Sequence, residues 1–368
     1  MRKNLFKILL CLTAAFAITA CSSDDDPVQV SFPGNSVTVS NGAYIVCSGN
    51  ESSQISGSLT YINYNSTSAI QGVFKTANNR NLGLTVNDGV TYGSKMYIVV
   101  SDENTIEVIN KNSLKSLSQI STTALLGTKN GAMPRHLFTG NGKVYVTTYG
   151  GYVAAIDTAS YKLTQSWQVG SYPEGITGYG NDLYVTNSDY GNGHGTISVI
   201  NVVDNTVKTS TVKGIENPQN VFVNNNGVYV MDWGHYLSIS PWTQQNAGLK
   251  KISENGDTCS LVADATLASY YNGTFYLINA AYGASAVSYS AYNASTGKSS
   301  TLSSVSVDSP AAIAVDPVSG NLFIASYNLG LDSYTTDGYV SEFSNSGTLI
   351  KKFDCGVGPV AVFFNTNK

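Results

Sequence analysis

An aromatic residue followed by β-branched residues recurs seven times along this chain of 368 residues, each time within a short run of alternating apolar and polar positions. The aromatic residue falls at positions 44, 97, 145, 184, 229, 276 and 323, so successive repeats are 53, 48, 39, 45, 47 and 47 residues apart. A turn rich in Gly and Asn precedes most runs, and a loop and a second alternating run follow, as expected of β-hairpins. A period in the forties without helical periodicity between the runs disfavours a solenoid and is typical of four-stranded propeller blades. The pattern therefore predicts an all-β fold, a seven-bladed β-propeller.

The end of the chain indicates how the ring closes. Residues 358–364 resemble the segment that precedes the aromatic run in other repeats, for example residues 172–176 and 309–313. The first repeat has no such segment of its own before Tyr44. We therefore expect the C-terminal strand to pair with the N-terminal blade as its innermost strand, which would leave no open sheet edge there.

The N-terminal residues have the features of a lipoprotein export signal. Arg2, Lys3 and Lys7 precede an apolar stretch over residues 8–20 that is too short for an ordinary transmembrane helix. Residues 18–21, Ile-Thr-Ala-Cys, form a lipobox, which predicts removal of residues 1–20 and acylation of Cys21. We expect residues 21–40 to be a lipidated flexible tether and residues 41–368 to form the propeller.

The net charge of the chain disfavours one class of partner, and the positions of the cysteines indicate which of them could be bonded. Loss of residues 1–20 removes three basic and no acidic residues, leaving 17 basic and 24 acidic residues and a net charge of −7. A nucleic-acid partner is therefore not expected. Apart from Cys11 in the signal and Cys21, the cysteines are Cys47, Cys259 and Cys355. Cys47 and Cys355 could be neighbours, either as a disulfide or as buried free thiols.

Strand direction divides the connections into two sets. In antiparallel blades, the short Asn-, Asp- and Gly-rich turns must all lie on one face of the ring, which we call the bottom face. The longer loops and the crossovers between blades must lie on the opposite, top face. These loops carry eight aromatic residues, namely Tyr149, Tyr190, Trp233, Tyr236, Trp242, Tyr282, Tyr327 and Tyr334. The crossovers are expected to add polar and aromatic residues near the axis: Arg80, Asn81, Arg135, His136, Tyr172, Glu174, Gln219 and Asn220.

Irregular aromatic loops on one side of a rigid ring indicate a recognition surface. The predicted ligand-binding residues are Arg80, Asn81, Arg135, Tyr149, Tyr172, Glu174, Tyr190, Gln219, Trp233, Tyr236, Trp242, Tyr282 and Tyr327. No catalytic residues, metal site or cofactor are predicted. The chain has three His, none in a metal-binding pair, and the set Glu174, Asn220 and Asp232 matches only part of the axial metal site of propeller lactonases. We therefore expect a binding protein rather than an enzyme.

Two resemblances add to this interpretation. The residues Leu-Tyr-Val-Thr-Asn at 183–187, Ile-Ser-Val-Ile-Asn at 197–201 and Tyr-Pro-Glu-Gly-Ile at 172–176 resemble the YncE-like, surface-layer-type propellers. The segments 49–63, 73–83 and 133–135, with the lipobox and the acidic run at 24–26, resemble the BtuG-type lipoproteins. The second resemblance implies a lipoprotein that faces outward from the outer membrane. It also implies that the protein captures cobalamin or a related corrinoid on its top face and passes it to a TonB-dependent-type outer-membrane transporter.

Two other functions fit the same residues. Tyr and Trp side chains also stack on sugar rings, so a glycan-binding lipoprotein is one alternative, and a protein-interaction scaffold of the cell envelope is another. Corrinoid binding predicts a spectral change of added cobalamin, glycan binding predicts retention on a polysaccharide column, and a scaffold predicts co-purification of a membrane partner. The amino-acid sequence leaves the oligomeric state open.

Overall fold

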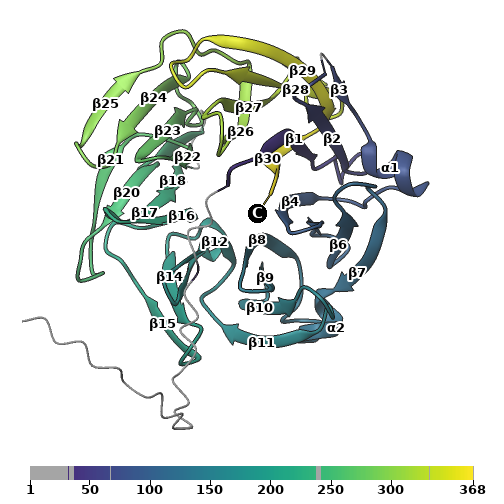
Figure 1. Ribbon diagram of the computed structural model, residues 1–368. Helices are drawn as coiled ribbons and strands as arrows, with labels where there is room; N and C mark the ends of the chain where they lie inside the picture. Colours follow the sequence, from purple (N-terminus) through teal and green to yellow (C-terminus); the bar gives the residue numbers. More distant parts are fainter. Residues whose placement is uncertain (1–31, 33–36, 67, 238–241, 331, 368) are drawn as a thin grey trace, which may run out of the picture.

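The computed structural model describes residues 32, 37–66, 68–237, 242–330 and 332–367. The predicted signal peptide, the lipidation site Cys21 and most of the predicted tether lie outside the described residues. The described chain forms seven four-stranded antiparallel sheets arranged as blades around a central axis (Figure 1), which confirms the seven-bladed β-propeller. Within these residues, no helix has the length and apolar character needed to cross a membrane.

The blades are numbered in chain order, and the strands of each blade are named from the innermost strand, at the axis, to the outermost strand, at the rim. Blade 1 contains β30 (Pro359–Thr366), β1 (Ser40–Cys47), β2 (Ser58–Asn63) and β3 (Ala69–Ile70). Blade 2 contains β4 (Val86–Tyr92), β5 (Lys95–Val100), β6 (Thr105–Asn110) and β7 (Ser116–Ser121). Blade 3 contains β8 (Pro134–Gly140), β9 (Lys143–Thr148), β10 (Tyr152–Asp157) and β11 (Leu163–Gln168). Blade 4 contains β12 (Pro173–Tyr179), β13 (Asp182–Asn187), β14 (Thr196–Asn201) and β15 (Thr206–Ser210).

The remaining blades follow the same order. Blade 5 contains β16 (Pro218–Asn224), β17 (Gly227–Asp232), β20 (Gly248–Ile252) and β21 (Cys259–Ala263). Blade 6 contains β22 (Leu267–Tyr271), β23 (Thr274–Asn279), β24 (Ser288–Asn293) and β25 (Lys298–Thr301). Blade 7 contains β26 (Ser309–Val315), β27 (Leu322–Tyr327), β28 (Asp337–Phe343) and β29 (Leu349–Val357). The additional elements are the helices α1 (Val73–Asn78) and α2 (Thr122–Leu126), the 3₁₀ turn η1 (Asp189–Gly191), and a hairpin of β18 (His235–Leu237) and β19 (Thr243–Gln245).

The ring closes as the sequence predicts, by pairing of the last strand with the first. β30 pairs antiparallel with β1, with Tyr44 opposite Phe363 and Ile45 opposite Val362. In Figure 1 the yellow β30 lies near the centre of the ring, beside β1. A second link joins blade 1 to blade 7, because Asp316 Oδ2 accepts hydrogen bonds from Ser40 Oγ at 2.5 Å and Tyr64 Oη at 2.6 Å. Both ends of the ring are therefore joined by backbone and side-chain contacts.

The apolar core lies mainly between neighbouring blades. One buried cluster joins Ala43 and Ile45 of blade 1 to Phe323 and Val340 of blade 7, and another joins Tyr44 to Met96 and Ile98 of blade 2. Six of the seven repeated aromatic side chains are at most 6% exposed, and Tyr184 is half-buried. The repeated aromatic residue therefore fills the space between sheets, where burial of its large side chain stabilises the ring.

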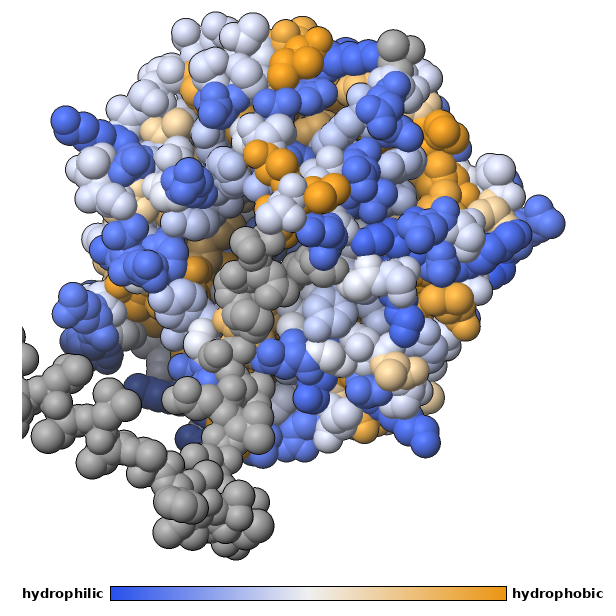
Figure 2. All heavy atoms as spheres, viewed as in Figure 1, coloured by the Kyte–Doolittle hydropathy of each residue, from blue (hydrophilic) through white to orange (hydrophobic). Residues whose placement is uncertain are grey.

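The division into two faces is confirmed by the strand pairing. Asn141 and Gly142 join β8 to β9 with φ values of 52° and 72°, the pair of positive values that a tight two-residue hairpin turn requires. The top-face connection from β17 to β20 contains the β18–β19 hairpin rather than only a loop. On the face seen in Figure 2, hydrophobic residues form small separate groups among hydrophilic ones.

Two details of the predicted boundaries change. Ordered structure begins before residue 41, because β1 starts at Ser40 and the backbone N–H groups of Thr38 and Val39 donate to Asn367 Oδ1. Within the predicted tether, Phe32 is buried against the ring. Of the described part of residues 21–40, Phe32 packs on the ring and residues 38–40 are joined to it by hydrogen bonds or strand pairing.

The structure also decides between the two states considered for Cys47 and Cys355. They are buried neighbours in the cluster between blades 1 and 7, and both are free thiols. A hydrogen bond from Cys355 lowers the pKa of Cys47. Cys259, on β21, is also free and half-buried.

Candidate functional site

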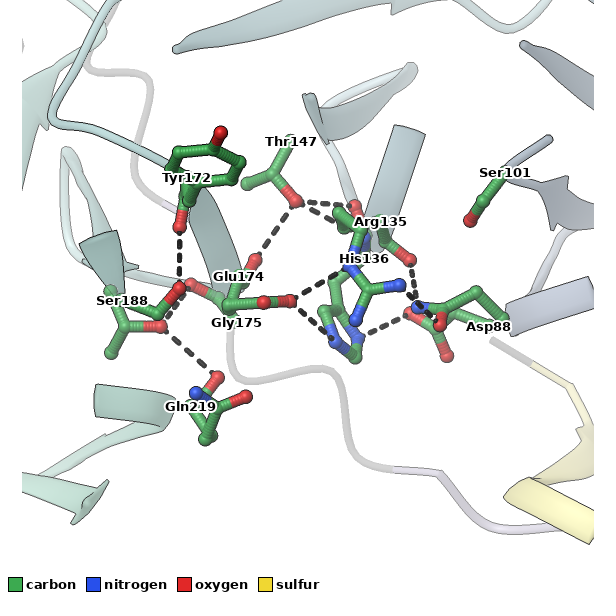
Figure 3. Close-up of polar contacts among 12 residues, drawn as sticks. Asp88, Ser101, Arg135, His136, Thr147, Tyr172, Glu174, Gly175, Ser188 and Gln219 are labelled. Atoms are coloured by element: carbon green, nitrogen blue, oxygen red, sulfur yellow. Dashed lines mark hydrogen bonds and ion pairs between the residues drawn. The ribbon is translucent and has the colours of Figure 1, made fainter. Parts of the chain in front are cut away.

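Ionisable side chains of blades 2, 3 and 4 meet at the top ends of their inner strands (Figure 3). Arg135 Nε donates to Glu174 Oε2 at 2.9 Å, and His136 Nδ1 lies 3.3 Å from Asp88 Oδ2. His136 Nε2 lies 3.8 Å from Glu174 Oε2. The side chain of Glu174 is 4% exposed and that of Arg135 is 18% exposed, so their ion pair is largely buried. We call Asp88, Arg135, His136 and Glu174 the axial cluster.

The Arg135 side chain makes two further contacts inside the protein. Its Nη1 donates to Asn87 Oδ1 at 2.8 Å, and its guanidinium lies 4.7 Å from the centre of the Tyr149 ring. Tyr149 Oη in turn donates to Glu174 Oε1 at 2.5 Å. Burial alone would lower the pKa of Arg135, but the Glu174 carboxylate raises it above its usual value, so the guanidinium remains charged. Burial and the same carboxylate raise the pKa of Tyr149, which keeps its hydroxyl protonated as a donor.

A repeated hydrogen bond holds the inner strands at this level. In blades 2, 3 and 4, a fully buried hydroxyl at the end of the second strand donates to a backbone carbonyl of the next blade's inner strand. The three bonds are Ser101 Oγ to Pro134 O at 2.7 Å, Thr147 Oγ1 to Glu174 O at 2.8 Å and Thr186 Oγ1 to Gln219 O at 3.1 Å. These bonds fix the backbone that carries the axial cluster, so its side chains are held by a rigid scaffold.

Three tyrosines form an exposed cluster above blades 3 and 4. The ring of Tyr172 lies 5.1 Å from that of Tyr149 and 5.0 Å from that of Tyr190, centre to centre. Tyr172 and Tyr190 are 36% and 68% exposed. We call these residues the tyrosine cluster. Because Tyr149 contacts both Arg135 and Glu174, the cluster stands directly on the axial cluster.

Backbone geometry helps to position two of these rings. Tyr172 and Tyr190 have positive φ values of 50° and 55°, which are uncommon for bulky residues. Thr85 and Met133 have φ values of 54° and 50° at the same place, directly before the inner strands of blades 2 and 3. The conformation of Tyr172 is therefore a property of the blade entrance, whereas that of Tyr190 belongs to the short turn η1.

A second exposed aromatic group lies on blades 5 and 6. Tyr236 in β18, Trp242 directly before β19 and Tyr282 in the β23–β24 loop line a shallow hollow of about 320 Å³. Their exposed fractions are 45%, 51% and 62%. We call this set the aromatic hollow. Gln244 ties it together, because its N–H donates to Tyr282 O at 2.9 Å and its Oε1 accepts from Tyr282 N–H at 3.2 Å.

The predicted residues Trp233 and Tyr327 occupy different positions on the top face. The Trp233 indole N–H donates to Thr266 O at 2.7 Å, and the Trp233 backbone carbonyl accepts a hydrogen bond from the Gln244 side chain. This half-buried residue therefore helps to hold Gln244, which contacts the aromatic hollow. Tyr327 packs edge-on against the exposed Tyr334, with ring centres 5.2 Å apart, above blade 7. Asn50 of blade 1 reaches the same loop by donating to Tyr334 O.

The prediction that Arg80 and Asn81 lie near the axis is wrong. Arg80 Nη2 lies 2.6 Å from Glu107 Oε1 on β6 and 3.2 Å from Ser116 Oγ on β7, the outermost strand of blade 2. Asn81 donates to Ser56 Oγ. The crossover that carries both residues contains α1, which packs on β2, and this excursion carries them toward the rim.

Asp232 does not extend an axial metal site. Its carboxylate is completely buried, pairs with Lys250 Nζ at 2.7 Å and accepts from the backbone N–H groups of Glu216 and Asn217. Asp232 is thus a structural residue of blade 5. Among the described residues, no group of three or more His, Cys, Asp or Glu side chains is placed to hold a metal ion.

The space around the axis is lined by all seven blades, and its ionisable lining residues lie on blades 2 and 3. A cavity of about 410 Å³ is lined on blades 2 to 5 by residues that include Asp88, His136 and Asn220. On blades 6, 7 and 1 its lining includes Ala268, Ala311 and Val360. Gln219, one of the predicted residues, lies at the top of blade 5 beside this cavity, where its amide donates to Asn217 Oδ1 at 2.7 Å.

Asn87 and Asp88 are site residues that the sequence analysis did not identify. They occupy the second and third positions of the inner strand β4, as Arg135 and His136 do in β8. Aligning the first residues of the inner strands would have placed Asp88 beside His136. The segment was missed because it begins with Val86, whereas the neighbouring segments begin with Pro.

Comparisons with known proteins support the fold alone. No family model matches the sequence, and no curated protein matches it. Among solved structures, a functionally unknown protein from Desulfotomaculum acetoxidans aligns over 88% of this chain and 99% of its own, at 12% identity and a TM-score of 0.56. The WD40 repeats of RRP9 align over 75% of this chain and 82% of their own, at 9% identity and a TM-score of 0.53. At these low identities, both similarities support the fold and no particular function.

Proposed function

We propose that this protein is a surface-exposed lipoprotein that captures cobalamin or a related corrinoid on its top face and passes it to an outer-membrane transporter. The observation that carries the proposal is the placement of two exposed aromatic groups, the tyrosine cluster and the aromatic hollow, on the same face as the axial cluster. A corrinoid is a broad apolar ring with amide side chains at its edge. Flat aromatic side chains next to amide, carboxylate and guanidinium groups suit both parts of such a ligand.

The energetics are consistent with a ligand that covers several rings at once. Half-covering three or four large aromatic side chains would bury about 300–400 Å², a gross gain of about 8–10 kcal/mol at roughly 25 cal/mol/Å². Association costs about 4–15 kcal/mol in lost freedom. Hydrogen bonds to the ligand must therefore supply the surplus, and the half-buried side chains of His136 in the axial cluster and of Gln219 on blade 5 can make them.

The lipid anchor and the outer-membrane location belong to this proposal and are supported by the lipobox at residues 18–21 and by the acidic run at 24–26. The resemblance to the BtuG-type lipoproteins supports the choice of ligand. The seven-bladed ring is compatible with the proposed lipid anchor and with the proposed ligand.

The test uses the soluble chain, residues 22–368, mixed with cyanocobalamin and passed through a gel-filtration column. We expect the cobalamin absorbance to elute with the protein and its spectrum to change. Elution of all cobalamin in the small-molecule volume at micromolar protein would contradict corrinoid capture.

Glycan binding is the second candidate, and the aromatic hollow favours it. Three exposed rings around a shallow hollow can stack on the faces of sugar rings. If this is the function, the soluble chain will be retarded in native gels that contain a polysaccharide, and substitution of Trp242 by Ala will abolish the retardation while cobalamin has no effect.

A further inference from the structure

A socket on the bottom face holds one residue of the N-terminal segment. The Phe32 side chain is 8% exposed and packs edge-on against Phe138 and Tyr145, with ring centres 5.3 and 5.7 Å away. Its backbone N–H donates to Gly180 O at 2.5 Å, in the turn that joins β12 to β13. Phe32 also belongs to a buried cluster that contains Trp167 and Leu183. The residue thus fills a space between blades 3 and 4.

Two glycines shape this socket. A Cβ atom on Gly140, at the bottom end of β8, would lie 2.9 Å from Phe32 Cδ1. A Cβ atom on Gly178, in β12, would lie 2.5 Å from Phe138 Cε1 and 2.8 Å from Phe32 Cδ2. All these distances are too short for carbon atoms, so Gly140 leaves room for the Phe32 ring, and Gly178 leaves room for Phe32 and for the Phe138 ring that packs on it.

We propose that this socket is the docking site of the chain's own N-terminal segment and that it determines which face of the propeller points away from the lipid anchor. The part that concerns orientation rests on the proposed lipidation of Cys21. Phe32 follows Cys21 by 11 positions. A fully extended chain of this length reaches at most about 36–40 Å.

This reach is too short for the top face to rest on the membrane that holds the lipid anchor while Phe32 is docked. The socket lies beside inner strands, so a route to the top face must cross about three further strands at ~4.8 Å each and then rise about 20 Å along the blade. That path of roughly 35 Å would use nearly the whole reach before the top-face loops are passed. While Phe32 is docked, the top face is therefore held away from the lipid and is presented to the surroundings.

The same geometry has a consequence for ligand transfer. With Phe32 docked, the tyrosine cluster and the aromatic hollow point away from the anchoring membrane and are open to incoming ligand. Delivery to a transporter in that membrane requires the top face to turn toward it, and Phe32 must leave its socket for this rotation. The socket thus separates a capture orientation from a delivery orientation.

Docking is tested on the soluble chain, residues 22–368, by hydrogen–deuterium exchange at the Phe32 amide. We expect Phe32→Ala and Gly140→Ala each to speed exchange at residue 32 at least tenfold. The control Val39→Ala changes an exposed side chain of the same segment and should leave this rate unchanged. Exchange at the unprotected rate in the unmodified chain would overturn docking.

Orientation is tested with the lipidated protein in vesicles of phosphatidylethanolamine and phosphatidylglycerol that carry a rhodamine lipid. In a Cys259→Ser background, a fluorescent donor is attached through Ser346→Cys in a bottom turn or through Thr335→Cys in a top loop of the same blade. We expect stronger energy transfer from position 346, and loss of the difference in Phe32→Ala. Stronger transfer from position 335 would overturn the orientation. Failure to associate with vesicles would contradict the proposed anchor and the orientation with it, while the exchange result still decides docking.

Discussion

Substitution of Arg135 by Ala is expected to destabilise the propeller substantially, because this side chain balances a buried carboxylate. The change removes the 2.9 Å ion pair with Glu174, the hydrogen bond to Asn87 and the contact with the Tyr149 ring. Removal of one partner of a buried ion pair costs about 3–5 kcal/mol. Since the Arg135 side chain remains 18% exposed, solvent screens part of this loss, and we expect about 2–4 kcal/mol.

The assay is urea unfolding of the Arg135→Ala, Glu174→Ala and doubly substituted chains, followed by tryptophan fluorescence. The double substitution leaves no unpaired charge, so its cost should be lower than the sum of the two single costs by at least about 1 kcal/mol. His194→Ala is the control, because its contact with Asp189 involves a side chain that is 83% exposed and should contribute little. A cost below about 0.5 kcal/mol for Arg135→Ala, or strict additivity, would refute the reasoning.

Four further predictions follow from other contacts. Burial alone would raise the pKa of Asp316, but hydrogen bonds from Ser40 and Tyr64 lower this pKa below its ordinary value. The ionised carboxylate therefore stabilises the fold fully at pH values above the ordinary pKa, and this stabilisation is lost as the pH falls through the lower pKa of the folded state. Asp316→Asn should flatten the decline in unfolding free energy between about pH 5 and pH 2 in urea titrations, and an unchanged decline would contradict this. Trp242→Ala and Tyr282→Ala should each weaken ligand binding about tenfold, or ~1.4 kcal/mol, in calorimetry, whereas Tyr179→Ala, an exposed tyrosine at the bottom end of β12, should not. In the soluble chain Cys259 should react with a thiol reagent before unfolding, whereas Cys47 and Cys355 should react only after it, and early reaction of all three would be inconsistent with the buried pair. Truncation before Gly358 removes β30 and should abolish the cooperative urea transition, since β1 would lose its inner partner; a sharp transition in the truncated chain would disprove the role of closure.

The blade number, the closure and the two faces could be predicted because they depend on local rules. The repeated aromatic residue sets the period, and the antiparallel order of strands decides on which face each connection lies. Residues 358–364 predicted the C-terminal partner of Tyr44 because the first repeat lacked its own inner strand. These features require only that neighbouring strands pair.

The composition of the site was harder to predict because it depends on contacts between blades. Arg80 was placed near the axis as a crossover residue, but α1 carries its crossover outward to the ion pair with Glu107. Asp88 was missed although it faces His136, since its strand begins with Val rather than Pro. Phe32 was assigned to a free tether because the glycines that admit its ring, Gly140 and Gly178, lie more than 100 residues away in the sequence.

The central claim is that the top face, and not the bottom face, carries the ligand site. The most direct measurement is calorimetric titration of residues 22–368 with cyanocobalamin, repeated with Trp242→Ala, with Tyr190→Ala and with the bottom-face control Tyr179→Ala. We predict saturable binding of one ligand per chain, weakened by both top-face substitutions and unchanged in the control. Absence of saturable heat, or binding that is weakened only by the bottom-face substitution, would contradict the account.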